Sequence, residues 1–212
     1  AGFEPGLIIG DFDSSDMPVC DAEILRLPHE KDDTDTFYCI KEAVKRGADE
    51  VEIFCALGGR ADHTLSNIFN LEYLLRNHVR ASIISDKCVL TLHKKSFEIQ
   101  KGKYAYFSLF ALGGDVTGLS IKGAAYELSD FTLSTFSSIG QSNEFKNDTV
   151  KITFDSGCIL LILSNDKYLL LRDFLWLAFG IGCALTICLP VEWLVLILAI
   201  AVIILGIICC TK

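Results

Sequence analysis

Residues 50–86 read EVEIFCALGGRADHTLSNIFNLEYLLRNHVRASIISD, and this stretch decides the fold that the sequence predicts. It begins with a short apolar run that ends in two glycines, continues with apolar residues at helical spacing over 62–78, and ends in a second apolar run at 81–86. A strand, a helix and a strand in this order predict neighbouring strands of a parallel sheet. Ligands of such sheets bind outside the carboxyl ends of the strands, so the glycine turn at 58–59 marks an expected ligand site.

The rest of the chain divides into regions with different patterns of apolar residues. An apolar run at 6–10 predicts a further strand, and residues 33–47 predict a helix closed by a glycine. From about residue 96 the helical period disappears, and short runs of β-branched and aromatic residues alternate with Gly, Asp, Asn and Ser, as is typical of an antiparallel sandwich. The predicted fold is therefore α/β, with a parallel-sheet domain at 1–95, an antiparallel β-sandwich domain at 96–165 and a hydrophobic helical hairpin tail at 166–212.

The composition limits the class of function. The chain has 212 residues, of which 51% are hydrophobic, and a formal net charge of −8 at pH 7. This acidic balance argues against a nucleic-acid partner, because phosphate backbones are bound by clustered Lys and Arg. The cysteines number nine and contain no C-x-x-C pair, which fits neither a disulfide framework nor a zinc site and favours reduced thiols.

The apolar excess is concentrated at the C-terminus. From residue 174 to residue 210 the only formally charged residue is Glu192. One helix over this stretch would be about 55 Å long, against a hydrocarbon core of about 30 Å, and Pro190 disfavours a continuous helix. The tail therefore predicts a transmembrane helical hairpin that turns at 190–192 and anchors cytoplasmic catalytic domains to the membrane. The alternative is a hydrophobic hairpin buried against the body.

Acidic residues follow the first predicted strand. Asp11 and Asp13 lie two positions apart, directly after four residues without a polar side chain. One interpretation is a simple turn, because Asp and Ser side chains hydrogen-bond the nearby backbone. The other is a site for Mg²⁺, which proteins usually hold through one or two carboxylates together with substrate phosphates. The spacing of the two acids leaves both interpretations open.

Two further polar clusters favour the second interpretation. Residues 30–35 combine four acids with a threonine, although such residues also begin helices. Residues 58–63 combine two glycines, which let the backbone approach a ligand, with Arg60, whose planar fork suits phosphate. Carboxylates for Mg²⁺ and a cation for phosphate at the ends of successive strands indicate metal-assisted phosphoryl or pyrophosphoryl transfer.

Four short motifs stand in order along the chain. They are GDFDS at 10–14, EKDDTDT at 30–36, GGRADHTLSN at 58–67 and GQSNEF at 140–145. In this order they resemble the motifs of the thiamine pyrophosphokinase family, and the resemblance covers most of the chain before the tail. It implies an α/β domain that binds ATP and Mg²⁺, a β-sandwich that binds thiamine, and a homodimer with active sites at the subunit interface. The implied reaction moves the β,γ-pyrophosphate of ATP to the thiamine hydroxyl and yields thiamine diphosphate and AMP.

The resemblance also implies roles for particular residues, which are carried over motif by motif. Catalytic roles fall to the acids of the first two motifs, Asp13, Asp32 and Asp35. The same motifs supply the Mg²⁺ ligands, Asp11, Asp13 and Asp35. The expected nucleotide contacts are Asp11, Thr34, Arg60 and Asp62, and the expected thiamine contacts are Ser142 and Asn143.

Two departures from the family pattern accompany the resemblance. Family members carry an earlier strand and an A-D-G-G motif, which residues from Ala1 onward do not supply; the expected missing unit is about 30 residues long. In some members an aromatic residue stacks on thiamine, and because both tryptophans lie in the tail, a Phe or Tyr of the β domain is expected to serve. Two rival functions are a membrane-tethered nucleotide- or thiamine-binding protein without catalysis, and a phosphoryl-transfer enzyme for another alcohol.

Overall fold

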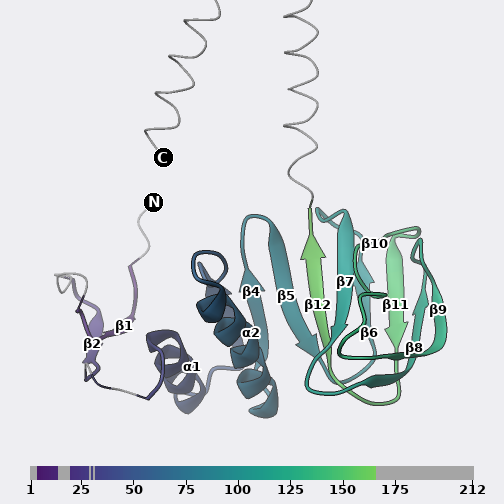
Figure 1. Ribbon diagram of the computed structural model, residues 1–212. Helices are drawn as coiled ribbons and strands as arrows, with labels where there is room; N and C mark the ends of the chain where they lie inside the picture. Colours follow the sequence, from purple (N-terminus) through teal and green to yellow (C-terminus); the bar gives the residue numbers. More distant parts are fainter. Residues whose placement is uncertain (1–3, 14–19, 29, 31, 166–212) are drawn as a thin grey trace, which may run out of the picture. The chain divides into compact units, whose positions relative to one another are not determined.

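The structure is a computed structural model that describes residues 4–13, 20–28, 30 and 32–165 (Figure 1). Two helices and twelve strands lie in these residues. In chain order they are β1 (Leu7–Gly10), β2 (Glu23–Arg26), α1 (Asp35–Lys45), β3 (Glu50–Phe54), α2 (Ala61–Arg76), β4 (Arg80–Ile84), β5 (Cys88–His93), β6 (Phe97–Gln100), β7 (Tyr106–Ala111), β8 (Val116–Lys122), β9 (Leu128–Leu133), β10 (Asn143–Glu144), β11 (Thr149–Thr153) and β12 (Ile159–Ser164).

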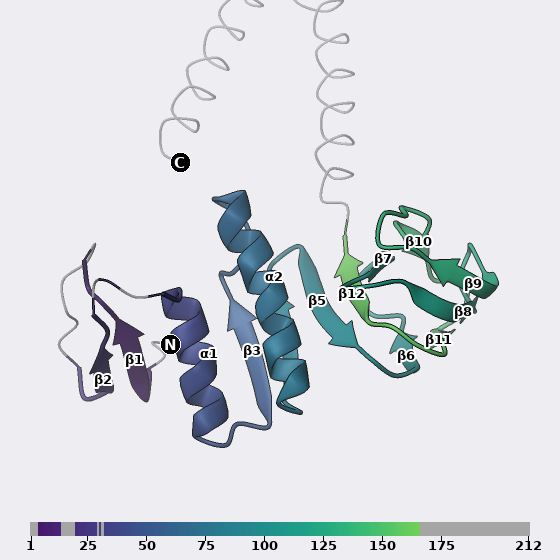
Figure 2. The same ribbon diagram turned by 60° about the horizontal axis from the view of Figure 1, so that its bottom comes forward.

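The strands form three sheets. β1 and β2 pair in parallel as a small sheet of their own. The largest sheet has the strand order β10-β7-β12-β5-β4-β3, in which only the β3–β4 pair is parallel. The third sheet is antiparallel and has the order β6-β11-β8-β9. Helix α2 packs on β4 and β5, and Figure 2 shows it on the side of the largest sheet that lies away from β8 and β11.

Local sequence signals explain where the helices begin and end. The Thr34 side chain accepts a hydrogen bond from the Phe37 N–H group (3.2 Å) and so caps α1. Asp35 lies in the first turn of α1 and Lys45 in its last turn, where each charge opposes the helix dipole. Gly47, with φ of 84°, then ends the helical path.

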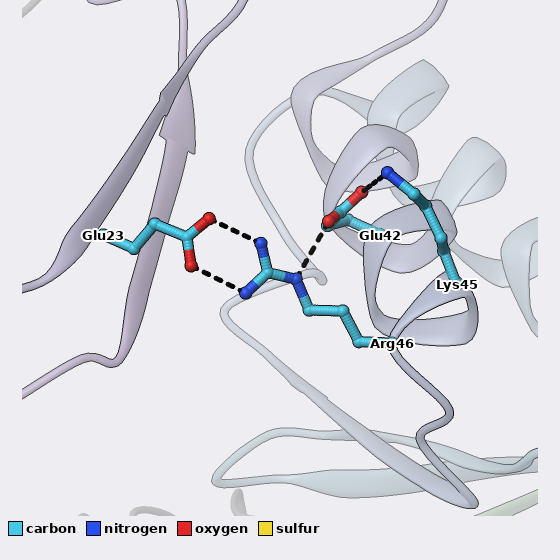
Figure 3. A network of polar contacts seen from close by, with 4 residues as sticks. All are labelled: Glu23, Glu42, Lys45 and Arg46. Carbon is cyan, nitrogen blue, oxygen red and sulfur yellow. Dashed lines mark hydrogen bonds and ion pairs between the residues drawn. The ribbon is translucent and has the colours of Figure 1, made fainter.

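A network of charged side chains joins β2 to the end of α1 (Figure 3). The Arg46 guanidinium donates two hydrogen bonds to the Glu23 carboxylate, at 2.7 and 2.8 Å, and a third from Nε to Glu42 at 2.9 Å. Lys45 Nζ donates to the other oxygen of Glu42 at 3.3 Å. The hydrogen bond from Arg46 lowers the pKa of Glu23, so both partners stay charged near neutral pH. This bidentate pair is a specific tie between β2 and α1.

β12 is shared by both hydrophobic cores. It pairs with β5 on one side and with β7 on the other. Ile159 and Leu161 belong to the core between the six-stranded and four-stranded sheets, whereas Leu160 belongs to the core that the helices cover. The two cores receive alternate residues because successive side chains of a strand point to opposite faces of the sheet. The apolar run of β12 therefore shows no alternation with polar residues.

The turn between β4 and β5 reverses the direction of the chain within the largest sheet. The Ser85 N–H group donates to the Cys88 carbonyl at 2.9 Å, and Ser85 Oγ accepts from the N–H groups of Lys87 and Cys88. This closed turn makes β5 antiparallel to β4. The predicted α/β class is confirmed in its coarse form, a sheet-rich α/β fold. The prediction of a separate parallel sheet is wrong, because the sheet continues from β5 into antiparallel strands that come from beyond residue 96.

The predicted membrane anchoring is contradicted. Among the residues that the structure describes, no helix is long and apolar enough to cross a membrane. α1 and α2 have 11 and 16 residues, against the roughly 20 apolar residues that a span requires. The predicted helical hairpin falls on residues 166–212, which lie outside the described residues. The prediction of cytoplasmic domains held at a membrane is therefore withdrawn.

Candidate active site

A tight loop joins β3 to α2 at the carboxyl end of β3. Cys55, Gly58 and Gly59 have positive φ angles of 58°, 97° and 64°. Glycine adopts such angles freely, whereas Cys55 is a non-glycine residue in a sparsely populated conformation. A Cβ atom at Gly58 or Gly59 would meet no atom within 4 Å. The two glycines are therefore required by the backbone path of the loop and leave open space in front of it.

Two side chains of α2 hold this loop in place. Thr64 Oγ1 accepts a hydrogen bond from the Gly58 N–H group at 3.2 Å and lies 3.3 Å from the carbonyl oxygens of Gly58 and Arg60. Asn67 Nδ2 donates to the Ala56 carbonyl at 2.9 Å. The helix thus fixes the loop that precedes it, and N–H groups at such a helix N-terminus favour an anionic ligand.

Arg60 and Asp62, both predicted nucleotide contacts, lie together at the start of α2. Arg60 donates from Nε and Nη2 to the two carboxylate oxygens of Asp62, at 3.1 and 2.5 Å. Asp62 Oδ1 also accepts from the His63 N–H group at 2.9 Å. The hydrogen bonds from Arg60, and to a smaller extent the one from the His63 N–H group, lower the pKa of Asp62 and keep it ionised. Both side chains are well exposed, so the edge of the Arg60 guanidinium that does not contact Asp62 is accessible to a ligand.

Asp33, one of the acids that precede α1, is tied to a lysine that the sequence analysis missed. Lys41 Nζ pairs with Asp33 at 2.6 Å and lies 4.1 Å from the centre of the Tyr38 ring. The hydrogen bond to Asp33 raises the pKa of Lys41. Helical spacing could have indicated this contact, because Lys41 follows Tyr38 by three positions and Phe37 by four.

Thr34 has a structural role, the capping of α1, in addition to its expected nucleotide contact.

Asp11 and Asp13 share one turn after β1. Asp11 Oδ1 accepts a hydrogen bond from the Asp13 N–H group at 3.2 Å, and Phe12 between them has a φ of 56°. This is the geometry of the turn interpretation. Within the described part of the chain, no three His, Cys, Asp or Glu side chains gather closely enough to hold a metal ion. The structure therefore does not place Asp35 with the other two acids in one cluster, and Asp32 is exposed. The catalytic and metal-binding roles of these acids stay predictions.

Ser142 and Asn143, the expected thiamine contacts, have different surroundings. Ser142 is exposed, and its backbone N–H group donates to Ser108 Oγ at 2.9 Å. Asn143 is buried, with 5% of its surface exposed. Its Oδ1 atom accepts from the Tyr126 N–H group at 3.0 Å, and its Nδ2 atom donates to the Tyr126 carbonyl at 2.7 Å. The Asn143 amide therefore holds the backbone of Tyr126, whose side chain is 68% exposed.

Gly140 fixes the start of this segment against β7. The Leu109 N–H group donates to the Gly140 carbonyl at 2.8 Å. A Cβ atom at residue 140 would lie only 2.2 Å from the Leu109 carbonyl oxygen, so no larger residue fits without a backbone shift. The segment 140–143 is thus pressed against the sheet, and Ser142 faces outward with a φ of 55°. Tyr126 was missed because sequence spacing does not reveal its contact with Asn143.

Comparisons with known proteins decide the family. The family model described as "Thiamin pyrophosphokinase, catalytic domain" matches residues 1–83, and that described as "Thiamin pyrophosphokinase, vitamin B1 binding domain" matches residues 94–159. Together the two models match more than half of the chain. The chain belongs to the thiamine pyrophosphokinase family. The catalytic-domain match supports an ATP-dependent transferase, as the resemblance of the four motifs implied.

Individual thiamine pyrophosphokinases agree with this family. Thiamine pyrophosphokinase 1 of Oryza sativa subsp. japonica is 29% identical over 76% of this chain, and the match spans 66% of the rice protein, just under two thirds. The thiamine pyrophosphokinase of Bacillus subtilis is 27% identical over 78% of this chain and 81% of that protein. The crystal structure of a Bacillus subtilis thiamine pyrophosphokinase has a TM-score of 0.71 and 25% identity, with 78% of this chain and 81% of that chain covered.

The two hydrogen bonds between Asn143 and Tyr126 generate a prediction about stability. Asn143→Ala removes a buried amide and leaves the backbone N–H and C=O groups of Tyr126 without these partners, so the free energy of unfolding should fall by about 1–3 kcal/mol. Gln141→Ala, an exposed change two positions earlier, is the control and should change it by less than about 0.5 kcal/mol. Urea unfolding followed by circular dichroism measures both. Equal stability of the two variants would show that the Asn143 amide does not hold Tyr126.

Proposed function

We propose that this chain transfers the β,γ-pyrophosphate of ATP to the hydroxyl group of thiamine, giving thiamine diphosphate and AMP. The observation that carries the proposal is the presence of the family's catalytic and vitamin B1 binding domains, in this order, in one chain. In the reaction the hydroxyl oxygen bonds to the β-phosphorus, and the bond from that phosphorus to the oxygen bridging the α-phosphorus breaks. That oxygen leaves on AMP, and the hydroxyl proton passes to a base.

The nucleotide side of the proposed site is the loop between β3 and α2. Its backbone is pinned by Thr64 and Asn67, so its N–H groups need little reordering when phosphate binds. The Arg60 fork is the proposed partner of the phosphate oxygens, and Asp62 orients it through two hydrogen bonds. Thr34 and Asp11 complete the proposed nucleotide contacts.

The acids supply the proposed metal and proton chemistry. Asp11, Asp13 and Asp35 offer only hard carboxylate oxygens, the donor type that suits Mg²⁺, and fewer than three are needed because substrate phosphates usually complete the shell. Bound there, Mg²⁺ would offset the negative charge of the polyphosphate. Asp32 and Asp35 are the proposed groups that orient the thiamine hydroxyl or accept its proton. Lys41 holds Asp33 beside them and so keeps a positive charge next to the acids.

The thiamine side of the proposed site lies in the β domain. Asn143 holds the backbone of Tyr126, whose side chain is exposed, and follows the exposed Ser142 directly in the chain. An aromatic face attracts a cation such as the thiazolium ring of thiamine. Tyr126 therefore fills the role of the stacking aromatic residue, and Asn143 positions it.

The family resemblance extends the proposal to a homodimer. Leu65 and Phe69 lie one turn apart on α2 and are 52% and 50% exposed. Exposed apolar side chains on one helix face are typical of protein–protein contact surfaces. They support an interface between copies of this chain near the loop that carries Arg60.

The products of the reaction test the proposed function. With ATP, Mg²⁺ and thiamine, the purified chain should form thiamine diphosphate and AMP in equal amounts, measured by chromatography. Asp35→Asn in the same expression system is the control for a contaminating kinase, and its rate should fall at least about a hundredfold because it loses a proposed base and metal ligand. ADP as the nucleotide product would mean transfer of a single phosphoryl group and would contradict the proposal.

Tyr126 gives a second test, which concerns substrate binding. Tyr126→Ala should raise the KM for thiamine about tenfold, the effect of losing roughly 1.4 kcal/mol of cation–π attraction, and leave the KM for ATP nearly unchanged. Tyr126→Phe keeps the aromatic face and should stay close to the unmodified chain. A Tyr126→Ala variant with a normal KM for thiamine would remove Tyr126 from the site.

A further inference from the structure

A groove lies at the C-terminal end of α2, which is the end far from the proposed active site. It has a volume of about 990 Å³ and is lined by the last turn of α2, the start of β4, the end of β5 and the turn from β5 to β6. Figure 2 shows the last turn of α2 and the arrowhead of β5 at the same end of the sheet, while the loop that follows β3 is at the other. The 16 residues of α2 separate the two places by about 24 Å.

The rim of the groove is positively charged in a chain that is acidic as a whole. Its lining has four formally positive side chains, Arg76, Arg80, Lys94 and Lys95, and one negative side chain, Glu50. All four cations are exposed. Arg76 donates from Nε and Nη2 to Glu72 at 3.1 and 2.7 Å, and Arg80 pairs with Glu50 through Nη2 at 3.2 Å. Lys94 and Lys95 form no ion pair within the described part of the chain. The positive charge of the rim that no carboxylate neutralises is therefore that of Lys94 and Lys95.

The wall of the groove is flat and largely apolar. His93 stacks on Phe97 with ring centres 3.8 Å apart and an angle of 16° between the planes. Thr91 Oγ1 lies 2.9 Å from His93 Nε2, which fixes the orientation of the imidazole. Burial lowers the pKa of His93 to about 4, so this ring is neutral near pH 7. The half-buried Leu75 of α2 also lines the groove, above the fully buried Leu71.

We infer that this groove binds a small phosphorylated molecule with a flat ring, at a site separate from the proposed active site. The volume is at the upper end of the range for small-molecule sites, which are mostly apolar with a few charged groups that fix orientation. Lys94 and Lys95 supply two unpaired point charges for a phosphate, and Arg76 and Arg80 can add the guanidinium N–H groups that do not contact Glu72 or Glu50. The stacked His93 and Phe97 offer a surface for the ring of the same ligand.

Pyridoxal 5′-phosphate is the probe for this site, because it combines a flat ring, a phosphate and an aldehyde that condenses with a nearby lysine amine and releases water. Borohydride then reduces the imine to a stable secondary amine, and peptide mass spectrometry identifies the modified lysine. In the full chain, Lys94 or Lys95 should be modified about tenfold faster than Lys101 and Lys103, which lie outside the groove. Pyridoxal, which lacks the phosphate, should show no such preference.

Variants of the arginines complete the test without removing the lysines that report it. Arg76→Gln with Arg80→Gln should abolish the preference for Lys94 and Lys95, because the phosphate loses both guanidinium groups of the rim. Arg26→Gln, an exposed change on β2, is the matched control and should retain the preference. Equal modification of all four lysines, or a preference that survives with pyridoxal or in the double variant, would overturn the inference.

Discussion

The structure depends on one strand that is buried on both faces. β12 places Ile159 and Leu161 in the core between the two larger sheets and Leu160 in the core beneath the helices, while its backbone bonds to β5 and β7. Neither core can form completely without it, because each lacks a wall until β12 is in place. The helices that support the nucleotide loop and the sheets that support Ser142 are therefore joined through a single apolar run near the end of the described chain.

The residues proposed for function stand on strained or pinned backbone at the edges of this framework. Phe12 and Ser142, non-glycine residues with positive φ angles, lie within two of the sequence motifs, and Cys55 lies three positions before a third. His78 and Asp130 share such angles and lie outside the motifs. Such conformations persist only where the surrounding structure enforces them, and they are frequent at functional sites. Here Asn67 holds the loop after Cys55, and the residue after Ser142 is Asn143, which holds Tyr126.

Local signals allowed much of the fold to be predicted, and contacts between distant residues account for the rest. The helices were found from the spacing of apolar residues, from the Thr34 cap and from Gly47, all of which act within a few positions. The mixed sheet was missed because the antiparallel pairing of β5 depends on a closed turn at Ser85 and on β12, some 70 positions later. Arg60 and Asp62 are neighbours in sequence and pair in the structure, whereas Tyr126 became visible only through its contact with a buried amide.

Native-state hydrogen exchange on the full chain tests most directly whether β12 unites the two cores. If it does, the slowest amides of β4 and of β11 exchange only through the same global opening, with free energies that agree within about 1 kcal/mol and fall together as denaturant is added. The small β1–β2 sheet is expected to open earlier, because an exposed ion pair between Glu23 and Arg46 joins it to α1 and exposed ion pairs contribute little to stability. Amides of β11 that exchange through an opening several kcal/mol below that of β4 would show two independent units and contradict the account.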